Sequence, residues 1–210
     1  MDNEFNINFS DKLSDTKLDF DLNFDIDFLK EHGNRYINPK PHKEIPEEKL
    51  YFEHARTLAR SITIEKNQRA HFILSGNFIF GDFIEAFFVE KNIKTKKLII
   101  STLSMSQNNI DSLVNLFTGN YIESLDLVIS DYFFAHERSE LIPYMLDELD
   151  INDRFQLAVA GSHTKICIFE SVVYGLKYVM HGSSNLRSSG CLEQLTVEEN
   201  PELYDFYKDF

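Results

Sequence analysis

The feature that most constrains the fold is an alternation of strand and helix patterns that begins near residue 48 and continues to residue 161. Strands are predicted for the short apolar runs at 70–76, 96–105, 124–133 and 154–161. Helices are predicted for the amphipathic stretches at 46–62, 82–92, 106–120 and 137–150. The second of these helices begins near Asp82, which can cap it, and the third is opened by Ser106.

The alternation stops at residue 161, and two apolar runs follow in close succession. Residues 164–171 and 176–184 are separated by only the segment "VVYG", which predicts a β-hairpin, and residues 201–210 predict a last helix. We therefore expect an α/β fold: a mostly parallel mixed sheet, flanked by helices on both faces, with an antiparallel hairpin near its C-terminal end.

The N-terminal segment differs from the rest in charge. Residues 1–28 hold eight Asp and Glu against two Lys, a net charge of −6 out of the −13 of the whole chain. The stretch "KLDFDLNFDIDFL" has the period-two alternation of a strand, but its many aspartates disfavour a strand. Two interpretations stay open: an acidic arm that becomes ordered on a partner or neighbouring protomer, and a packed edge strand. With the proline-containing linker that follows, it makes up residues 1–47, and the folded domain spans 48–210.

Composition excludes several classes of protein. No run approaches the about 20 apolar residues of a membrane span, and the acidic start lacks a secretory signal, so we expect a cytoplasmic protein without a membrane partner. Cys167 and Cys191 show no metal-ligand spacing, and we expect neither a disulfide nor a metal site. The net charge of −13 argues against a surface that binds nucleic acid everywhere, but permits a local basic cleft.

Polar residues interrupt the two strands of the predicted hairpin. In "HTKICIFE", His163 and Lys165 lie two apart and therefore share one face of a strand, while the alternate isoleucines face the core. Antiparallel pairing brings Ser183 and Asn185 of "GSSN" beside His163. An imidazole, an ammonium, an amide and hydroxyls at one sheet end suit a phosphate group, which the imidazole can attack.

These segments resemble the signature of the phospholipase D superfamily, H-x-K-x4-D followed by G-S-x-N. The resemblance covers the motif and, more loosely, the order of strands and helices over residues 68–195, and it implies a phospholipase D-like fold for residues 48–210. It also implies that His163 is the nucleophile that forms a phosphohistidine, that Lys165 and Asn185 bind the phosphate oxygens, that Ser183 adds a hydrogen bond, and that no metal or other cofactor is required.

The sequence departs from this signature at Glu170, where the family has an aspartate in a supporting role. The family places a glutamate downstream that orients a catalytic histidine, and Glu193 is our candidate. Glu198 and Glu199 are alternatives, and an ordinary solvated carboxylate of a loop is a further interpretation.

Further substrate contacts are predicted next to the motif. Ser184 lies inside "GSSN", and Arg187 follows it closely. Arg187, with Lys177 at the start of the second hairpin strand, supplies positive charge for a cleft, although either can equally be an ordinary exposed charge.

The chain has one such motif, whereas the reaction needs a second imidazole to protonate the leaving oxygen. The remaining histidines lack the surrounding pattern, and His181 is expected to be structural. We therefore predict a C2 homodimer whose active site lies across the two-fold axis. The expected function is a metal-independent DNA endonuclease. A catalytically degenerate phosphate- or nucleic-acid-binding module and a phospholipase are the alternatives.

Overall fold

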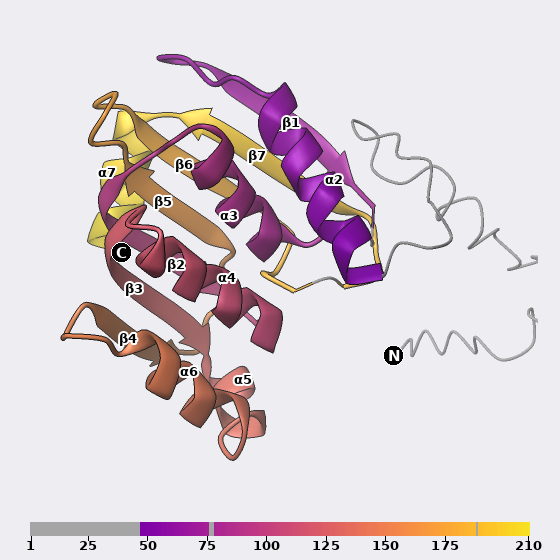
Figure 1. The fold of residues 1–210 in the computed structure, drawn as a ribbon, viewed down its shortest axis with the longest axis vertical. Helices are drawn as coiled ribbons and strands as arrows, with labels where there is room; N and C mark the ends of the chain where they lie inside the picture. Colours follow the sequence, from indigo (N-terminus) through magenta and orange to yellow (C-terminus); the bar gives the residue numbers. More distant parts are fainter. Residues whose placement is uncertain (1–46, 76–77, 188) are drawn as a thin grey trace, which may run out of the picture.

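The computed structural model describes residues 47–75, 78–187 and 189–210 (Figure 1). The N-terminal arm and nearly all of the linker lie outside these residues. The strands are β1 (Arg69–Leu74), β2 (Thr95–Thr102), β3 (Ile122–Ser130), β4 (Phe155–Ala160), β5 (Ile166–Glu170), β6 (Lys177–Gly182) and β7 (Glu193–Glu199). The helices are α2 (Glu47–Ser61), α3 (Phe80–Glu90), α4 (Gln107–Thr118), α5 (Asp131–His136), α6 (Leu141–Leu149) and α7 (Pro201–Asp209).

The described strands form one seven-stranded sheet in the order β1-β7-β6-β5-β2-β3-β4. The predicted α/β class, with a mixed sheet flanked by helices and a β5–β6 hairpin, is confirmed. Fewer strand pairs are parallel than the alternation suggested: among the described strands, β2/β3 and β3/β4 are parallel, and four pairs are antiparallel. The sequence patterns do not predict β7, which lies between β6 and β1 and adds two of those antiparallel pairs.

The helices cover the two faces of the sheet unequally. Helices α2, α3, α4 and α6 lie on one face, and α7 lies on the other (Figure 1). Cys167 and Phe169 of β5 point into the larger core, where the Phe169 ring contacts the rings of Phe87 and Phe88 of α3 in tilted arrangements. Ile166 and Ile168 face the second, smaller cluster, which they form with Val179 and with α7. The expectation that these isoleucines are core residues is therefore correct, but their core is the minor one.

The helix ends differ in part from the sequence expectations. Ser106 caps α4 as predicted, in a capping box with Asn109. Helix α3 begins at Phe80, so Asp82 lies in its first turn and is not its cap. The segment from 131 to 149 forms two helices, α5 and α6, and Ser130 caps the first by accepting a hydrogen bond from the Phe133 amide.

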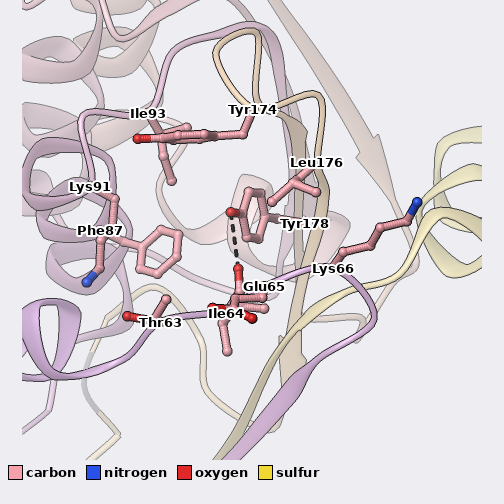
Figure 2. Close-up of a pocket in the computed structure, with 10 residues that line it drawn as sticks. All are labelled: Thr63, Ile64, Glu65, Lys66, Phe87, Lys91, Ile93, Tyr174, Leu176 and Tyr178. Carbon is pink, nitrogen blue, oxygen red and sulfur yellow. Dashed lines mark hydrogen bonds between the residues drawn. The ribbon is translucent and has the colours of Figure 1, made fainter.

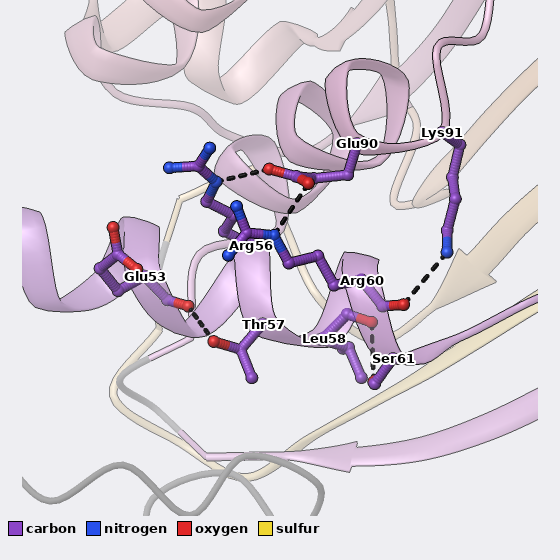
Figure 3. Close-up of polar contacts among 8 residues, drawn as sticks. All are labelled: Glu53, Arg56, Thr57, Leu58, Arg60, Ser61, Glu90 and Lys91. Atoms are coloured by element: carbon purple, nitrogen blue, oxygen red, sulfur yellow. Dashed lines mark hydrogen bonds and ion pairs between the residues drawn. The ribbon is translucent and has the colours of Figure 1, made fainter.

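An ion-pair network joins α2 to the end of α3 (Figure 3). The Glu90 carboxylate accepts hydrogen bonds from the Nε atoms of Arg56 and Arg60, and these bonds lower the pKa of Glu90. Lys91 Nζ donates to the Arg60 carbonyl at 3.2 Å. The network fixes the C-terminal end of α3 against α2.

Cys167 is buried and Cys191 exposed, and both thiols are free. None of the helices in the described ranges combines the length and the apolar character that a bilayer span requires.

Candidate functional site

The two halves of the motif lie beside each other at one end of the sheet. His163 and Lys165 immediately precede β5, and the Lys165 ammonium donates to the His163 carbonyl at 2.8 Å. Strand β6 pairs with β5 so that His181 faces Ile166, and the Gly182 amide donates to the Lys165 carbonyl at 3.4 Å. This register places the start of the segment Ser183–Asn185 next to Lys165. His163 is exposed to solvent.

Glu193 lies next to this segment as the first residue of β7, and is therefore not a loop carboxylate. Its carboxylate accepts a hydrogen bond from the Ser183 hydroxyl and another from Ser189 Oγ at 2.6 Å. Ser183 Oγ in turn accepts from the Gln194 amide at 3.0 Å. Ser183 and Glu193, two predicted site residues, are thus in direct contact.

Hydroxyl groups at the carboxyl end of β2 contact both segments of the motif. Ser101 Oγ and Thr164 Oγ1 are 2.5 Å apart, and Thr102 Oγ1 accepts from the Leu186 amide at 3.3 Å. Sequence reasoning missed these residues, although polar side chains at the end of an apolar parallel strand are a known signal of a binding edge.

The start of α3 also contacts the motif. The Gly81 amide donates to the Leu186 carbonyl at 2.9 Å, which ties the residue after Asn185 to α3. Asn109 of α4 lies against Gly81, because a Cβ atom at Gly81 would be 2.4 Å from Asn109 Nδ2. Helices α3 and α4 therefore position the loop that carries Asn185.

Several polar atoms under this loop are buried without a hydrogen-bond partner among the described residues. They are Ser184 Oγ, Asn185 Oδ1 and Asn109 Nδ2. The burial of Oδ1 turns the carbonyl oxygen of the Asn185 amide toward the protein interior. Burial of polar atoms without hydrogen-bond partners lowers the stability of the fold, and such atoms are characteristic of functional sites.

Asp82 is a mostly buried carboxyl group at the same helix start, and sequence reasoning assigned it only a capping role. Burial and the nearby charge of Glu85 raise its pKa to about 6. A carboxyl group that takes up a proton near neutral pH adds an ionisable group beside the motif loop.

The remaining predicted site residues lie elsewhere or on the rim. Glu170 lies at the opposite end of β5, paired in register with Lys177 of β6. Lys177 itself forms an ion pair with Asp205 of α7 at 2.6 Å. Arg187 is exposed just beyond the motif segment.

The alternative carboxylates and His181 form a separate cluster. His181 Nε2 lies 2.9 Å from Glu198 Oε1, and Arg69 lies 3.2 Å from the other oxygen of Glu198. Burial raises the pKa of Glu198, but hydrogen bonds from His181 and Asn200 outweigh this effect and hold the pKa below its usual range. Glu199 accepts from the Asn67 amide at 2.6 Å. Both glutamates are therefore occupied in tying β7 to its neighbouring segments.

No group of three or more His, Cys, Asp or Glu side chains within the described ranges is arranged to hold a metal ion. The groups at the site are thus an imidazole, an ammonium, an amide, hydroxyls and a carboxylate.

No protein-family model matches the sequence, and a search of curated proteins found no significant match. Among solved structures, the chain is similar to a polyphosphate kinase from Porphyromonas gingivalis, with 8% identity, a TM-score of 0.48 and coverage of 67% of this chain and 25% of the other.

Two further similarities have TM-scores of 0.42. One is to TrmBL2, an archaeal chromatin protein described as having a novel mode of DNA binding, with 10% identity and coverage of 78% of this chain and 57% of that one. The other is to a phosphatidylserine synthase from Haemophilus influenzae, with 11% identity and coverage of 80% and 45%. The chain thus spans between a quarter and just over half of these longer proteins, and similarities at this level carry no conclusion about its activity.

Proposed function

We propose that this chain is a metal-independent phosphodiesterase, and specifically a DNA endonuclease that acts through a phosphohistidine at a homodimer interface. The observation that carries the proposal is the proximity of the two motif halves. Lys165 precedes β5, the Gly182 amide donates to its carbonyl, and Ser183–Asn185 follows directly in the chain. These groups supply a nucleophile and donors for phosphate oxygens at one place.

The reaction has two steps. A neutral His163 nitrogen attacks the phosphorus atom, a phosphorus–nitrogen bond forms, and the bond to the leaving oxygen breaks as that oxygen takes a proton from the partner's His163. Water then attacks the phosphorus atom and gives its proton to the partner's His163, and the phosphorus–nitrogen bond breaks. Lys165 and Asn185 stabilise the charge on the phosphoryl oxygens in both steps.

Each chain gives one motif histidine, so the scheme requires two copies. Light scattering after gel filtration should give twice the 24.5 kDa of one chain. A monomer that retains full activity would exclude the shared site, while leaving phosphate binding by a single motif intact.

DNA is the proposed substrate because positive charge is local in a chain of net charge −13. Lys165 lies in the site and Arg187 is exposed just beyond it, whereas the other lysine of the hairpin, Lys177, lies at the far end of β6 and is paired with Asp205. A narrow basic site of this kind suits one phosphodiester of an extended strand better than a broad electrostatic surface.

The decisive experiment is an assay with single- and double-stranded DNA in excess EDTA. The wild-type protein is expected to cleave DNA under these conditions, and His163→Ala should reduce the rate to background. His136→Ala is the matched control, because His136 is also exposed but lies on α5. Equal loss of activity in both variants would contradict a nucleophilic role for His163.

A catalytically degenerate phosphate- or nucleic-acid-binding module is the second candidate. It is favoured by the position of Glu170, at the far end of β5 from His163, and by the replacement of the family's aspartate there. DNA binding without turnover, weakened by Lys165→Ala, would support this module over the nuclease.

A further inference from the structure

A cavity lies beside the turn between β5 and β6, which is at the opposite end of β5 from His163 (Figure 2). Its volume is about 430 Å³. It is lined by Thr63, Ile64, Glu65, Lys66, Phe87, Lys91, Ile93, Tyr174, Leu176 and Tyr178. None of these residues takes part in the proposed phosphodiesterase site.

Three of the ten residues that line the cavity are aromatic: Phe87, Tyr174 and Tyr178. Phe87 and Tyr178 are buried and meet edge to face, with ring centroids 5.9 Å apart, and the Tyr178 hydroxyl donates to the Ile64 carbonyl at 3.4 Å. Tyr174 is 56% exposed and stands on the opposite wall (Figure 2). These rings offer edges and faces to one further apolar or aromatic side chain.

The turn that holds Tyr174 is well ordered by hydrogen bonds. The amide of Gly175 donates to the Ser171 carbonyl at 2.7 Å, and the Tyr174 amide donates to Ser171 Oγ at 3.2 Å. Val172 and Val173, on the same turn, are also more than half exposed. Three consecutive large apolar residues exposed beside a cavity form the kind of patch that a partner covers.

Lysines outnumber acidic residues in the lining of the cavity, two to one. Lys66 and Lys91 line the cavity, and the carbonyl of Lys94 accepts a hydrogen bond from Val172 of the turn at 2.8 Å. One acidic residue, Glu65, also lines the cavity. Glu90, which precedes Lys91 in the chain, is paired with Arg56 and Arg60 (Figure 3). An occupant that combines aromatic rings with carboxylates would complement both the cavity and its rim.

The N-terminal arm has this chemistry. Residues 1–28 contain phenylalanines at positions 5, 9, 20, 24 and 28, eight acidic residues and two lysines. In "LDFDLNFDIDF", every phenylalanine has at least one aspartate next to it. We propose that a phenylalanine of this arm occupies the cavity, with its neighbouring aspartates close to the rim lysines.

The chain connection permits this contact. Residues 29–46 separate the arm from α2, and these 18 residues span up to about 60 Å when extended. Helix α2, with 15 residues, is about 22 Å long, and the cavity begins with Thr63, two residues after its end. Because the arm and the cavity are on one chain, the effective concentration of the arm is high, on the order of millimolar.

The absence of tryptophan from the chain provides a direct test. Each of the five arm phenylalanines is replaced by tryptophan, one at a time in the full-length protein, so that each variant carries a single fluorescent reporter: Phe5→Trp, Phe9→Trp, Phe20→Trp, Phe24→Trp and Phe28→Trp. At least one reporter should show blue-shifted emission and less quenching by acrylamide than the same protein in urea. The shift should be independent of protein concentration and should weaken at about 1 M salt, where charges are screened within about 3 Å.

Variants of the cavity locate the contact. Tyr174→Ala combined with Lys66→Glu alters two exposed residues, and should return the reporter emission and quenching to the values in urea. Tyr132→Ala is the matched control, because Tyr132 is 65% exposed on α5 and should leave the reporter unchanged.

Three results would overturn the proposal. If every reporter is as accessible to acrylamide as in urea, the arm does not occupy the cavity. A blue shift that survives the cavity variant would place the arm elsewhere, and a shift that grows with protein concentration would show insertion into another copy. DNA cleavage plays no part in these readouts, so the outcome is independent of the proposed nuclease activity.

Discussion

Gly81→Ala tests whether close packing of α3 on α4 supports the motif loop. A Cβ atom at Gly81 would lie 2.4 Å from Nδ2 and 2.9 Å from Cγ of Asn109. Asn109 is 1% exposed, and its Oδ1 accepts a hydrogen bond from the Ser106 amide at 2.9 Å. The side chain of Asn109 therefore has to give up its capping contact to make room.

The expected change in the free energy of unfolding is the sum of opposing effects. Alanine is favoured over glycine inside a helix by about 1 kcal/mol. Loss of the capping contact removes about 1 kcal/mol, and overpacking of a buried site costs about 1–3 kcal/mol. Gly81→Ala should therefore lower the free energy of unfolding by about 1–3 kcal/mol, and it should also displace the Leu186 carbonyl that bonds to the Gly81 amide.

Urea unfolding of four proteins measures the effect: wild type, Gly81→Ala, Asn109→Ala and the double variant. Removal of the Asn109 amide relieves the clash, so the coupling energy in this cycle should be about 1–2 kcal/mol. Gly161→Ala is a suitable control, because the nearest atom to its added Cβ, Asp131 Oδ2, is 3.8 Å away. A neutral or stabilising Gly81→Ala, or strictly additive effects, would refute the packing argument.

Three other predictions follow from single groups. The pKa of Asp82 is raised to about 6, so the contribution of this group to stability is complete below its unfolded pKa of 3.8 and is lost as the pH rises through about 6. Asp82→Asn should therefore raise the free energy of unfolding at about pH 8 by up to about 3 kcal/mol, and should lose this advantage below about pH 4. Urea titrations of both proteins at the two pH values measure the difference. Glu90→Gln removes the ion pairs with the two α2 arginines and should lower the melting temperature in dilute buffer, with a smaller loss at about 0.5 M salt; an equal loss at both ionic strengths would point to packing instead. Under native conditions a thiol reagent should modify Cys191, whereas Cys167, whose pKa is raised by complete burial, should react only after unfolding; rapid modification of two thiols in the native protein would be inconsistent with the structure.

The local patterns of the sequence were sufficient for most of the elements. Apolar spacing predicted β2, α4 and the β5–β6 hairpin, and Ser106 was recognised as the cap of α4. The hairpin also fixed the pairing that sets Gly182 beside Lys165, since an antiparallel pair joined by a short turn has little choice of register. These features depend on neighbouring residues, and a contiguous stretch of sequence contains the information.

Other features depended on contacts between distant segments. The stretch of β7 contains several glutamates, which are unfavourable in isolated strands, yet Glu198 is buried because His181 of β6 and Arg69 of β1 approach it from the two adjacent strands. The contact of Asn109 with Gly81 likewise requires α3 and α4 to be packed together. Sequence period determined which segments become strands and helices, whereas tertiary packing decided which strand lies between β1 and β6 and which polar groups become buried, because burial is created by residues that are far apart in the chain.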